Sequence, residues 1–231
     1  MRGLGVFALI FAEPQLRDLD DYLSAVEQFV TAERDTLVQR VNAAVAAQQL
    51  EGDELENHYF AHEDDIHRLA STFPRLVYAG TLLTACALFE SSLVDLCRDF
   101  DRDAALPKML TWGAIPARDS GLQRSARFLK ANFGIELAQY ARWDDLSRCY
   151  LVRNCVAHAD GDVSLMRADS AAKLNAAVRG LAPLGIRVSE LDKLDFGSTF
   201  VRAVIGEFRA FWPGLTRACR ENADVGPRYW P

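Results

Sequence analysis

The sequence predicts an all-α fold: an up-and-down helical bundle with an extra long helix at the N-terminus. One small β-hairpin is possible near residues 186–196. Three observations lead to this prediction. Apolar residues recur at steps of three and four over long stretches of the 231-residue chain. Half of all residues are hydrophobic, which is enough to fill a sizeable core. The alternation typical of a strand is found at 186–189, close before the last helical pattern.

The first predicted helix lies between Pro14 and about Gln49. Proline is tolerated in the first turn of a helix, so Pro14 is expected to begin it. Charged residues cover the face opposite the apolar stripe, as in an amphipathic helix that lies on a core. The stripe consists of Leu16, Leu19, Leu23, Val26, Val30, Leu37, Val41 and Val45. The apolar run of residues 4–12 is either a signal peptide or a segment packed on the bundle; the lack of a small-x-small cleavage site favours packing.

The second long helix is expected to begin at Pro74 and to be the central helix of the bundle. Two neighbouring apolar stripes widen its buried face. The first contains Tyr78, Leu82, Ala85, Phe89, Leu93, Leu96 and Phe100, and the second contains Leu76, Leu83, Ala87, Val94 and Cys97. Glu90 falls inside the second stripe, where a carboxylate is costly unless it is paired. Glu90 is therefore expected either to pair with Arg153 or to be an ordinary Glu at the edge of the core.

Four further helices and one hairpin are expected after a loop at 101–120, which Pro and Gly residues punctuate. The helices are predicted at Leu122–Asn132, Arg142–His158, about Ser164–Arg179 and from Ser198 or Thr199 to Trp212, where Pro213-Gly214 kinks or ends the last one. Strand-like segments at 186–189 and 191–196 precede the last helix. The chain is expected to be one domain, with a core at about 74–212, an N-terminal helical extension at 1–73 packed on it, and a polar tail at 221–231.

His58 and His62 lie four residues apart in an acidic segment and could share one helix face. Such a pair, with Glu63 or Asp65 nearby, is one way to hold a metal ion. The favoured interpretation is a solvated acidic helix that carries surface histidines. No metal site and no cofactor are therefore predicted.

The composition limits the classes of function. A net charge of −6 argues against broad, non-specific coating of nucleic acid but not against a local basic site. The cysteines are Cys86, Cys97, Cys149, Cys155 and Cys219, an odd number scattered through apolar helical patterns. This usage is typical of reduced core cysteines in a cytoplasmic protein. No apolar run is long enough to cross a bilayer, so no membrane association is expected.

The stretch most suggestive of chemistry is 151–161, at the end of an apolar helix. Arg153 presents a planar fork of donors that fits a phosphate. His158 is the side chain type that exchanges protons near neutral pH. A phosphate clamp beside a general acid or base is what cleavage of RNA through its own 2′-hydroxyl requires. The alternative is structural, because an Arg and a His near a helix end often serve as a C-cap and a partner of the helix dipole.

Arg153-Asn154 followed by His158, late in an all-helical chain, resembles the Arg-x4–6-His motif of HEPN domains. The resemblance covers roughly Pro74 to Trp212 and includes an acidic residue on the second bundle helix, at Glu90. It implies a homodimer in which two motifs share one cleft, with Asn154 positioning a phosphate oxygen or the imidazole. Some toxin members carry a Tyr two residues after the His. This chain has Asp160 there, so regulation through that Tyr is not implied.

A local excess of positive charge precedes and includes the motif. Residues 108–153 contain eight Lys or Arg against four acids. Such a reversal within an acidic chain is expected near an RNA backbone, although a run of charge is often only a solvated helix face. The predicted RNA-binding residues are Arg124, Arg127, Lys130 and Arg148.

Three functions remain open from the sequence. The first is a metal-independent endoribonuclease that leaves a 2′,3′-cyclic phosphate and refuses DNA, with Arg153, His158 and Asn154 as its catalytic residues. The family resemblance adds a role as toxin or antiviral effector, with an antitoxin or regulatory protein as a further partner. The second is a non-catalytic HEPN module that binds RNA or a nucleotide. The third is a structural dimerisation protein.

Overall fold

The fold is all-α, as the sequence predicts, with one two-stranded sheet among the described residues. The structure is a computed structural model that describes residues 4–103, 109–140 and 142–222. Side chains are described from Ala12 onward, except at 216 and 219–222. The predicted tail beyond residue 222, Lys108 and the side chain of Cys219 lie outside these residues.

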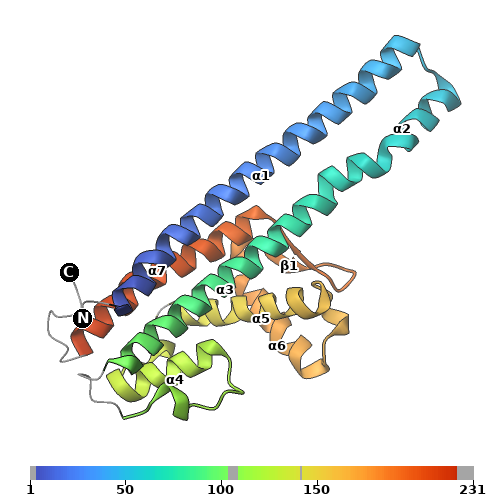
Figure 1. Cartoon of the computed structure of the whole chain (residues 1–231). Coiled ribbons are helices and arrows are strands. Elements are labelled where there is room, and N and C mark those ends of the chain that lie inside the picture. The colour runs from blue at the N-terminus through green and yellow to red at the C-terminus, as the bar shows by residue number, and fades with distance from the viewer. Residues whose placement is uncertain (1–3, 104–108, 141, 223–231) are drawn as a thin grey trace.

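Two long antiparallel stretches form an arm that projects beyond the rest of the molecule (Figure 1). α1 (Leu4–Gln48) runs outward and α2 (Gly52–His67) begins the return. Gln49 and Gly52 both have positive φ and reverse the chain at the tip. No residue of α2 is buried, because this part of the arm is only two helices thick.

The helices of the arm are more continuous than the sequence predicts. α1 begins at Leu4, so Pro14 lies inside it instead of starting it. The π-helical turn η1 (Arg68–Thr72) joins α2 directly to α3 (Phe73–Arg102), so no break precedes Pro74. A proline removes one helical hydrogen bond. Burial of Ala12 and Leu16 on either side of Pro14 offsets that loss, because the helix continues along an apolar core.

α3 is the central helix, as predicted. It packs against α1 on one side and elsewhere against α4 (Gly121–Phe133), α5 (Trp143–Ala159) and α7 (Ser198–Asn222). Phe89 at its middle is fully buried and stacks on Phe208 of α7, with ring centroids 4.5 Å apart. Phe211 and Trp212 complete this aromatic cluster. α7 passes through Pro213 and continues to Asn222, so the proline does not end the helix.

α4 (Gly121–Phe133) has the termini that the sequence indicates. Ser120 caps its first turn and forms a capping box with Gln123. Gly134, at φ +65°, ends it in the left-handed conformation that favours glycine. α5 (Trp143–Ala159) and α6 (Ala168–Leu181) follow and pack against each other.

The predicted hairpin is present and supports the end of α5. β1 (Ile186–Val188) pairs with β2 (Leu194–Phe196) in antiparallel register. The backbone N–H of Leu194 donates to the carbonyl of Gly161, at 2.8 Å, just beyond the end of α5. This contact holds the chain that follows the Arg-His motif against the rest of the domain.

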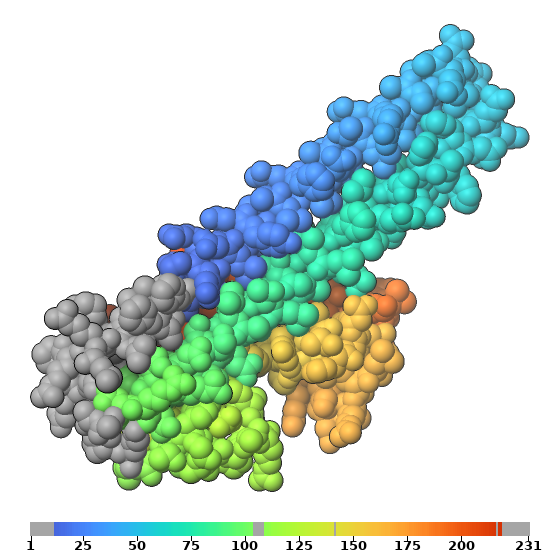
Figure 2. Space-filling model, in the orientation of Figure 1, coloured from blue at the N-terminus to red at the C-terminus, as the bar shows by residue number. Residues whose placement is uncertain are grey.

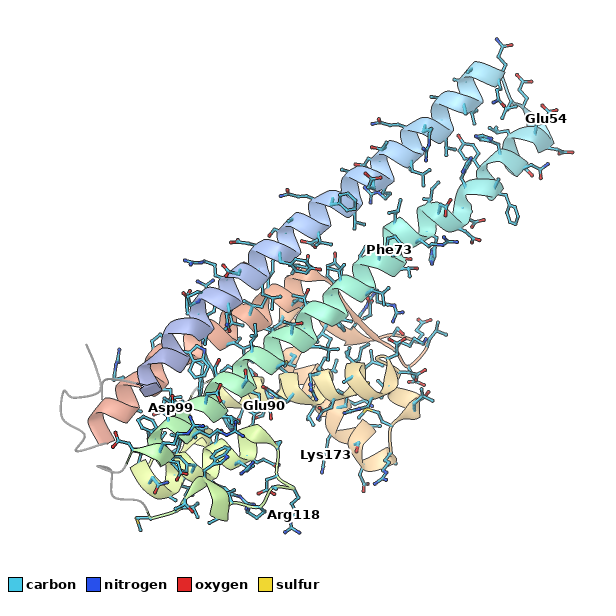
Figure 3. The ribbon with its side chains drawn as sticks, in the orientation of Figure 1. Glu54, Phe73, Glu90, Asp99, Arg118 and Lys173 are labelled. Carbon is cyan, nitrogen blue, oxygen red and sulfur yellow. The ribbon has the colours of Figure 1, made fainter. Side chains whose placement is uncertain are left out.

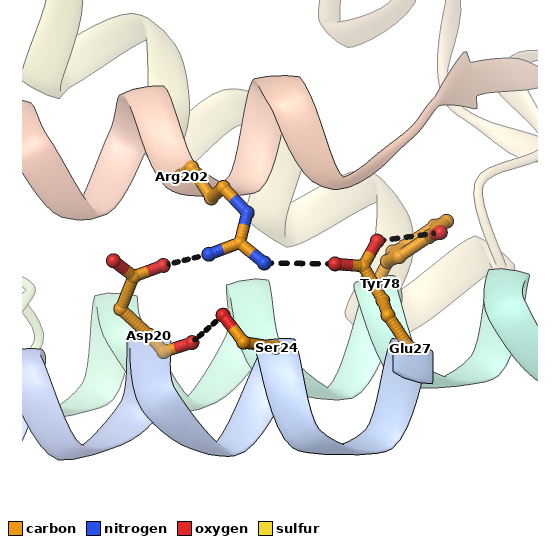
Figure 4. A network of polar contacts seen from close by, with 5 residues as sticks. All are labelled: Asp20, Ser24, Glu27, Tyr78 and Arg202. Carbon is orange, nitrogen blue, oxygen red and sulfur yellow. Dashed lines mark hydrogen bonds and ion pairs between the residues drawn. The ribbon is translucent and has the colours of Figure 1, made fainter. Parts of the chain in front are cut away.

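A polar network fixes α1 to α3 and α7 (Figure 4). Arg202 of α7 donates to Asp20 and to Glu27 of α1, at 2.5 and 2.8 Å. The Tyr78 hydroxyl of α3 donates to the second oxygen of Glu27, at 2.9 Å. Burial raises the pKa of Glu27, but hydrogen bonds from Ser198, Arg202 and Tyr78 outweigh it, so the pKa lies below its ordinary value.

One helical stretch of the described chain, Gly52–Arg102, is long and apolar enough to cross a membrane by length and composition alone. The sequence was expected to contain no such run, but the stretch includes α3, whose 30 residues are long enough by themselves. Of its most apolar window, 39% is buried inside the fold. Core helices of soluble proteins pass the same test, and α3 is the core helix of this bundle.

Candidate nucleic-acid interface

α5 carries both residues of the predicted motif on a regular helix. Asp144 and Asp145 lie in its first turn, where acidic side chains favour the helix dipole. Asp160, at φ +48°, ends it in the left-handed conformation, and the N–H of Gly161 donates to the carbonyl of Cys155. The end of this helix, predicted at His158, is confirmed to within one residue.

Arg153 lies at the seam between α5 and α3. Its guanidinium is half-buried, and Nη1 donates to Oδ1 of Asn154 at 3.0 Å. The Nε atom is buried and has no acceptor within the described chain. A buried donor without an acceptor costs about 1–3 kcal/mol. An anion that approached this guanidinium closely enough to accept from Nε would recover part of that cost.

His158 lies on the open side of α5. The side chain is exposed, and it has no hydrogen bond to any described residue. Five residues along a regular helix correspond to about 140° of rotation. The structure keeps α5 helical through Ala159, so Arg153 and His158 of one chain point in different directions. One chain thus offers both groups without bringing them together.

Glu90 is near Arg153 but does not pair with it. It has neither a hydrogen bond nor an ion pair with any described residue. Its carboxylate instead packs against the start of α4, where a Cβ added at Gly121 would meet Oε1 at 2.5 Å. Glu90 and Arg153 act on the same two groups, Cys86 and Tyr150. The negative charge of Glu90 raises the pKa of both, and the positive charge of Arg153 lowers the pKa of both. The two side chains thus share one stretch of the α3–α5 seam.

The groups between Glu90 and Arg153 are held neutral. The Tyr150 hydroxyl donates to the carbonyl of Cys86 at 2.6 Å. Burial is the main reason why the pKa values of the Cys86 thiol and the Tyr150 hydroxyl lie well above their ordinary values. Burial also raises the pKa of the Cys149 thiol to about 12. A thiol that stays protonated is a poor nucleophile. These residues therefore shape the seam rather than supply chemistry.

All four predicted RNA-binding cations have partners within the chain. Arg127 pairs with Asp119 at 2.9 Å, and Lys130 pairs with Glu136. The other two are structural as well. Arg148 pairs with Asp145 at 2.7 Å and lies against Gly180 of α6, and Arg124 stacks over the Trp112 ring at 4.4 Å while it donates to the Trp112 carbonyl. In Arg127, Lys130 and Arg148 a carboxylate compensates the charge locally, so these cations attract a phosphate less. Arg124 has no carboxylate partner among the described residues, and its Nε lacks an acceptor there.

Two other cations, which the sequence-based selection left out, are free. Arg118 precedes α4 and Lys173 lies on α6; both are exposed, and neither has a hydrogen bond or ion pair with a described residue. Figure 2 shows a notch between the lobe that contains α4 and the lobe that contains α5 and α6, with α3 above it. In Figure 3, Arg118 and Lys173 lie at the two sides of this notch and Glu90 lies between them on α3. Sequence could not select them, because pairing depends on the fold.

The described residues contain no group of three His, Cys, Asp or Glu that could hold a metal ion. The rings of His58 and His62 contact each other on α2, with centroids 5.1 Å apart. A cavity of about 250 Å³ lies elsewhere, between α1 and the start of α3, and is lined by Glu27, Arg34 and Tyr78 among others. It contains none of the predicted site residues.

Comparison with models of known protein families gave no match, and comparison with curated proteins or with solved structures gave none either.

Proposed function

We propose that this protein is a metal-independent endoribonuclease that cleaves RNA through its 2′-hydroxyl. The observation that carries the proposal is the motif on α5, where a half-buried guanidinium with an unsatisfied Nε precedes an exposed imidazole at the helix end. The likeness of Arg153-Asn154 and His158 to the HEPN motif supports it. The cytoplasm, where the cysteines stay reduced, is the proposed location.

The reaction needs one proton acceptor and one site of positive charge. The 2′-oxygen attacks the adjacent phosphorus, and the bond from phosphorus to the 5′-oxygen breaks. The products are a 2′,3′-cyclic phosphate and a 5′-hydroxyl. Arg153 stabilises the charge that develops on the phosphate oxygens. His158 either accepts the proton of the 2′-hydroxyl, with water protonating the departing 5′-oxygen, or donates a proton to the 5′-oxygen, with water accepting the proton of the 2′-hydroxyl. Asn154 holds the guanidinium through the hydrogen bond from Nη1.

We further propose that the active site forms between two copies of the chain. The regular geometry of α5 separates the two motif residues by about 140° of rotation, so they do not face one phosphate within one chain. A two-fold axis beside α5 would place Arg153 of one copy opposite His158 of the other. The face of α5 that carries Ser147 and His158 is exposed and leaves room for such a contact.

Removal of either motif residue tests the reaction. With labelled RNA in EDTA, Arg153→Ala and His158→Ala are each expected to lower the cleavage rate by about a hundredfold or more. Arg40→Ala, an exposed change on the projecting part of α1, is the control and should retain the parent rate. Fragment ends are assigned by mass spectrometry, and single-stranded DNA should remain intact. Cleavage that persists in the His158→Ala variant would contradict the proposal.

Mixing two inactive variants tests the composite site. If each site takes Arg153 from one copy and His158 from the other, an equimolar, refolded mixture of Arg153→Ala and His158→Ala should recover about a quarter of the parent activity, because half the dimers are mixed and each has one intact site of two. Each variant refolded alone is the control. A dimer that recovers nothing on mixing would place both residues of a site in one chain.

A non-catalytic RNA-binding module is the second candidate. The observations that favour it are that Nη1 of Arg153 already donates to Asn154, and that Arg153 and His158 of one chain point in different directions. The EDTA assay separates the two functions, since this candidate binds RNA and leaves it uncut. A purely structural role would show neither; there His158→Ala would lower only the melting temperature.

A further inference from the structure

We propose that the notch between α4 and α6 is the track of an unpaired RNA strand, and that Arg118 and Lys173 hold its phosphates from the two sides. This inference rests on the proposed function for the identity of the polymer, and it assigns a binding surface beyond the Arg-His motif. It also replaces the predicted RNA-binding residues, because those residues already have partners within the chain.

The first argument is the availability of charge. Arg124, Arg127, Lys130 and Arg148 each have a partner inside the fold. Arg118 and Lys173 are exposed and without partners among the described residues. A cation that neutralises a phosphate releases counterions bound to the nucleic acid. A cation without a carboxylate partner can do so without first breaking an ion pair within the protein. Free cations that border a hollow are therefore better placed to bind a polyanion than paired cations on a helix face.

The second argument is the position of the notch relative to the motif. Arg118 comes directly before α4, and α4 begins against Glu90, with Gly121 in contact with the Glu90 side chain. Glu90 is one helical turn from Cys86, and the pKa of Cys86 is affected by Arg153 of α5. α6, which carries Lys173, packs on the same α5. The notch therefore lies beside Arg153, so a strand within it passes the residue proposed to hold the scissile phosphate.

The third argument is the carboxylate between the two cations. Glu90 has no partner and would repel a phosphate placed directly upon it. It would accept hydrogen bonds from a ribose hydroxyl or a base amino group instead. The charge pattern thus favours a strand whose phosphates lie along the sides of the notch and whose sugars or bases turn towards α3. Such edges are accessible in unpaired RNA.

Salt-dependent binding tests this surface separately from catalysis. A fluorescein-labelled, unpaired 20-nucleotide RNA is titrated against the dimeric His158→Ala protein, so that no substrate is consumed. The slope of log Kd against log salt concentration is measured for Arg118→Ala, Lys173→Ala and the double variant. Each single change is expected to weaken binding severalfold and to reduce the slope by about 0.7, and the double change by about twice that amount.

Arg40→Ala is the matched control. Arg40 is also exposed and unpaired among the described residues, but it lies on the projecting part of α1, and its removal should leave the slope unchanged. A double variant whose slope equals those of the parent and of Arg40→Ala overturns the track, even if the parent cleaves RNA. A smaller slope of log Kd against log salt concentration in the double variant supports the track, even if the parent proves to bind RNA without cutting it.

Discussion

Gly121 sets how closely α4 approaches α3. A Cβ at this position would meet the Glu90 carboxylate at 2.5 Å, the Glu90 Cγ at 2.9 Å and a methyl of Val94 at 3.0 Å. Glycine is usually unfavourable inside a helix, so its presence in the first turn of α4 reflects the space left by α3. The contact also places Glu90 against α4 rather than against Arg153.

Gly121→Ala is expected to lower the free energy of unfolding by about 1–3 kcal/mol, because the added methyl forces Glu90 and Val94 to move. Combination with Glu90→Ala should recover part of this loss, since it removes two of the three contacts. Gly80→Ala is the control. Gly80 lies in α3, and nothing lies within 4 Å of the position that a Cβ would take. The free energy of unfolding of this variant should rise by about 0.5–1 kcal/mol. Urea denaturation measures all four proteins. An unchanged stability of Gly121→Ala would show that α4 can shift freely.

At the scale of elements, α1 is integrated into the bundle by polar as well as apolar contacts. Leu16 and Leu23 are fully buried against the core. Arg202 of α7 bridges two carboxylates on the same helix, and Tyr78 of α3 donates to one of them. The apolar stripe of α1 was readable from the sequence. The network was not, because its members lie far apart in the chain and share no spacing.

The stability that Glu27 provides should depend on pH. Its pKa is below the ordinary value of 4.5, since the hydrogen bonds outweigh burial. Its contribution is therefore fully present above about pH 5 and is lost as the pH falls through the folded-state pKa. Glu27→Gln should cost about 1 kcal/mol of unfolding free energy at pH 7, and this difference should shrink as the pH falls through the folded-state pKa.

Urea denaturation from pH 7 to pH 3 measures this dependence. Glu33→Gln serves as the control, because Glu33 is exposed on the same helix without a partner among the described residues. A difference between parent and Glu27→Gln that grows as the pH falls would contradict the assigned sign.

At the scale of the whole molecule, charge is distributed unevenly. Residues 51–72 contain seven acids and one Arg, a net charge of −6 that equals the charge of the entire chain. This segment forms α2 and η1 at the projecting end of the arm, which leaves the remainder neutral overall (Figure 1). The acidic balance of the composition therefore describes the arm rather than the surroundings of α5. A polyanion would therefore be repelled by this segment of the arm, whereas the rest of the chain carries no net charge.

The helical class, the central role of α3, the ends of α4 and α5, and the hairpin could all be predicted from the sequence. These features depend on local periodicity and on capping residues such as Ser120 and Gly134, whose conformational preferences act within a few residues. It misplaced the start of α1 and the break before Pro74, because packing along a core can hold a helix together through a local defect.

Which charged groups are free depends on the packing of the helices and could not be predicted from the sequence pattern. Arg127 and Arg118 look alike in the sequence, yet Asp119 pairs with the first and nothing described pairs with the second. The same holds for Glu90, which the fold turns towards Gly121. Availability of a charge depends on partners brought together by packing of several helices, and this information is not contained in the spacing along any one of them.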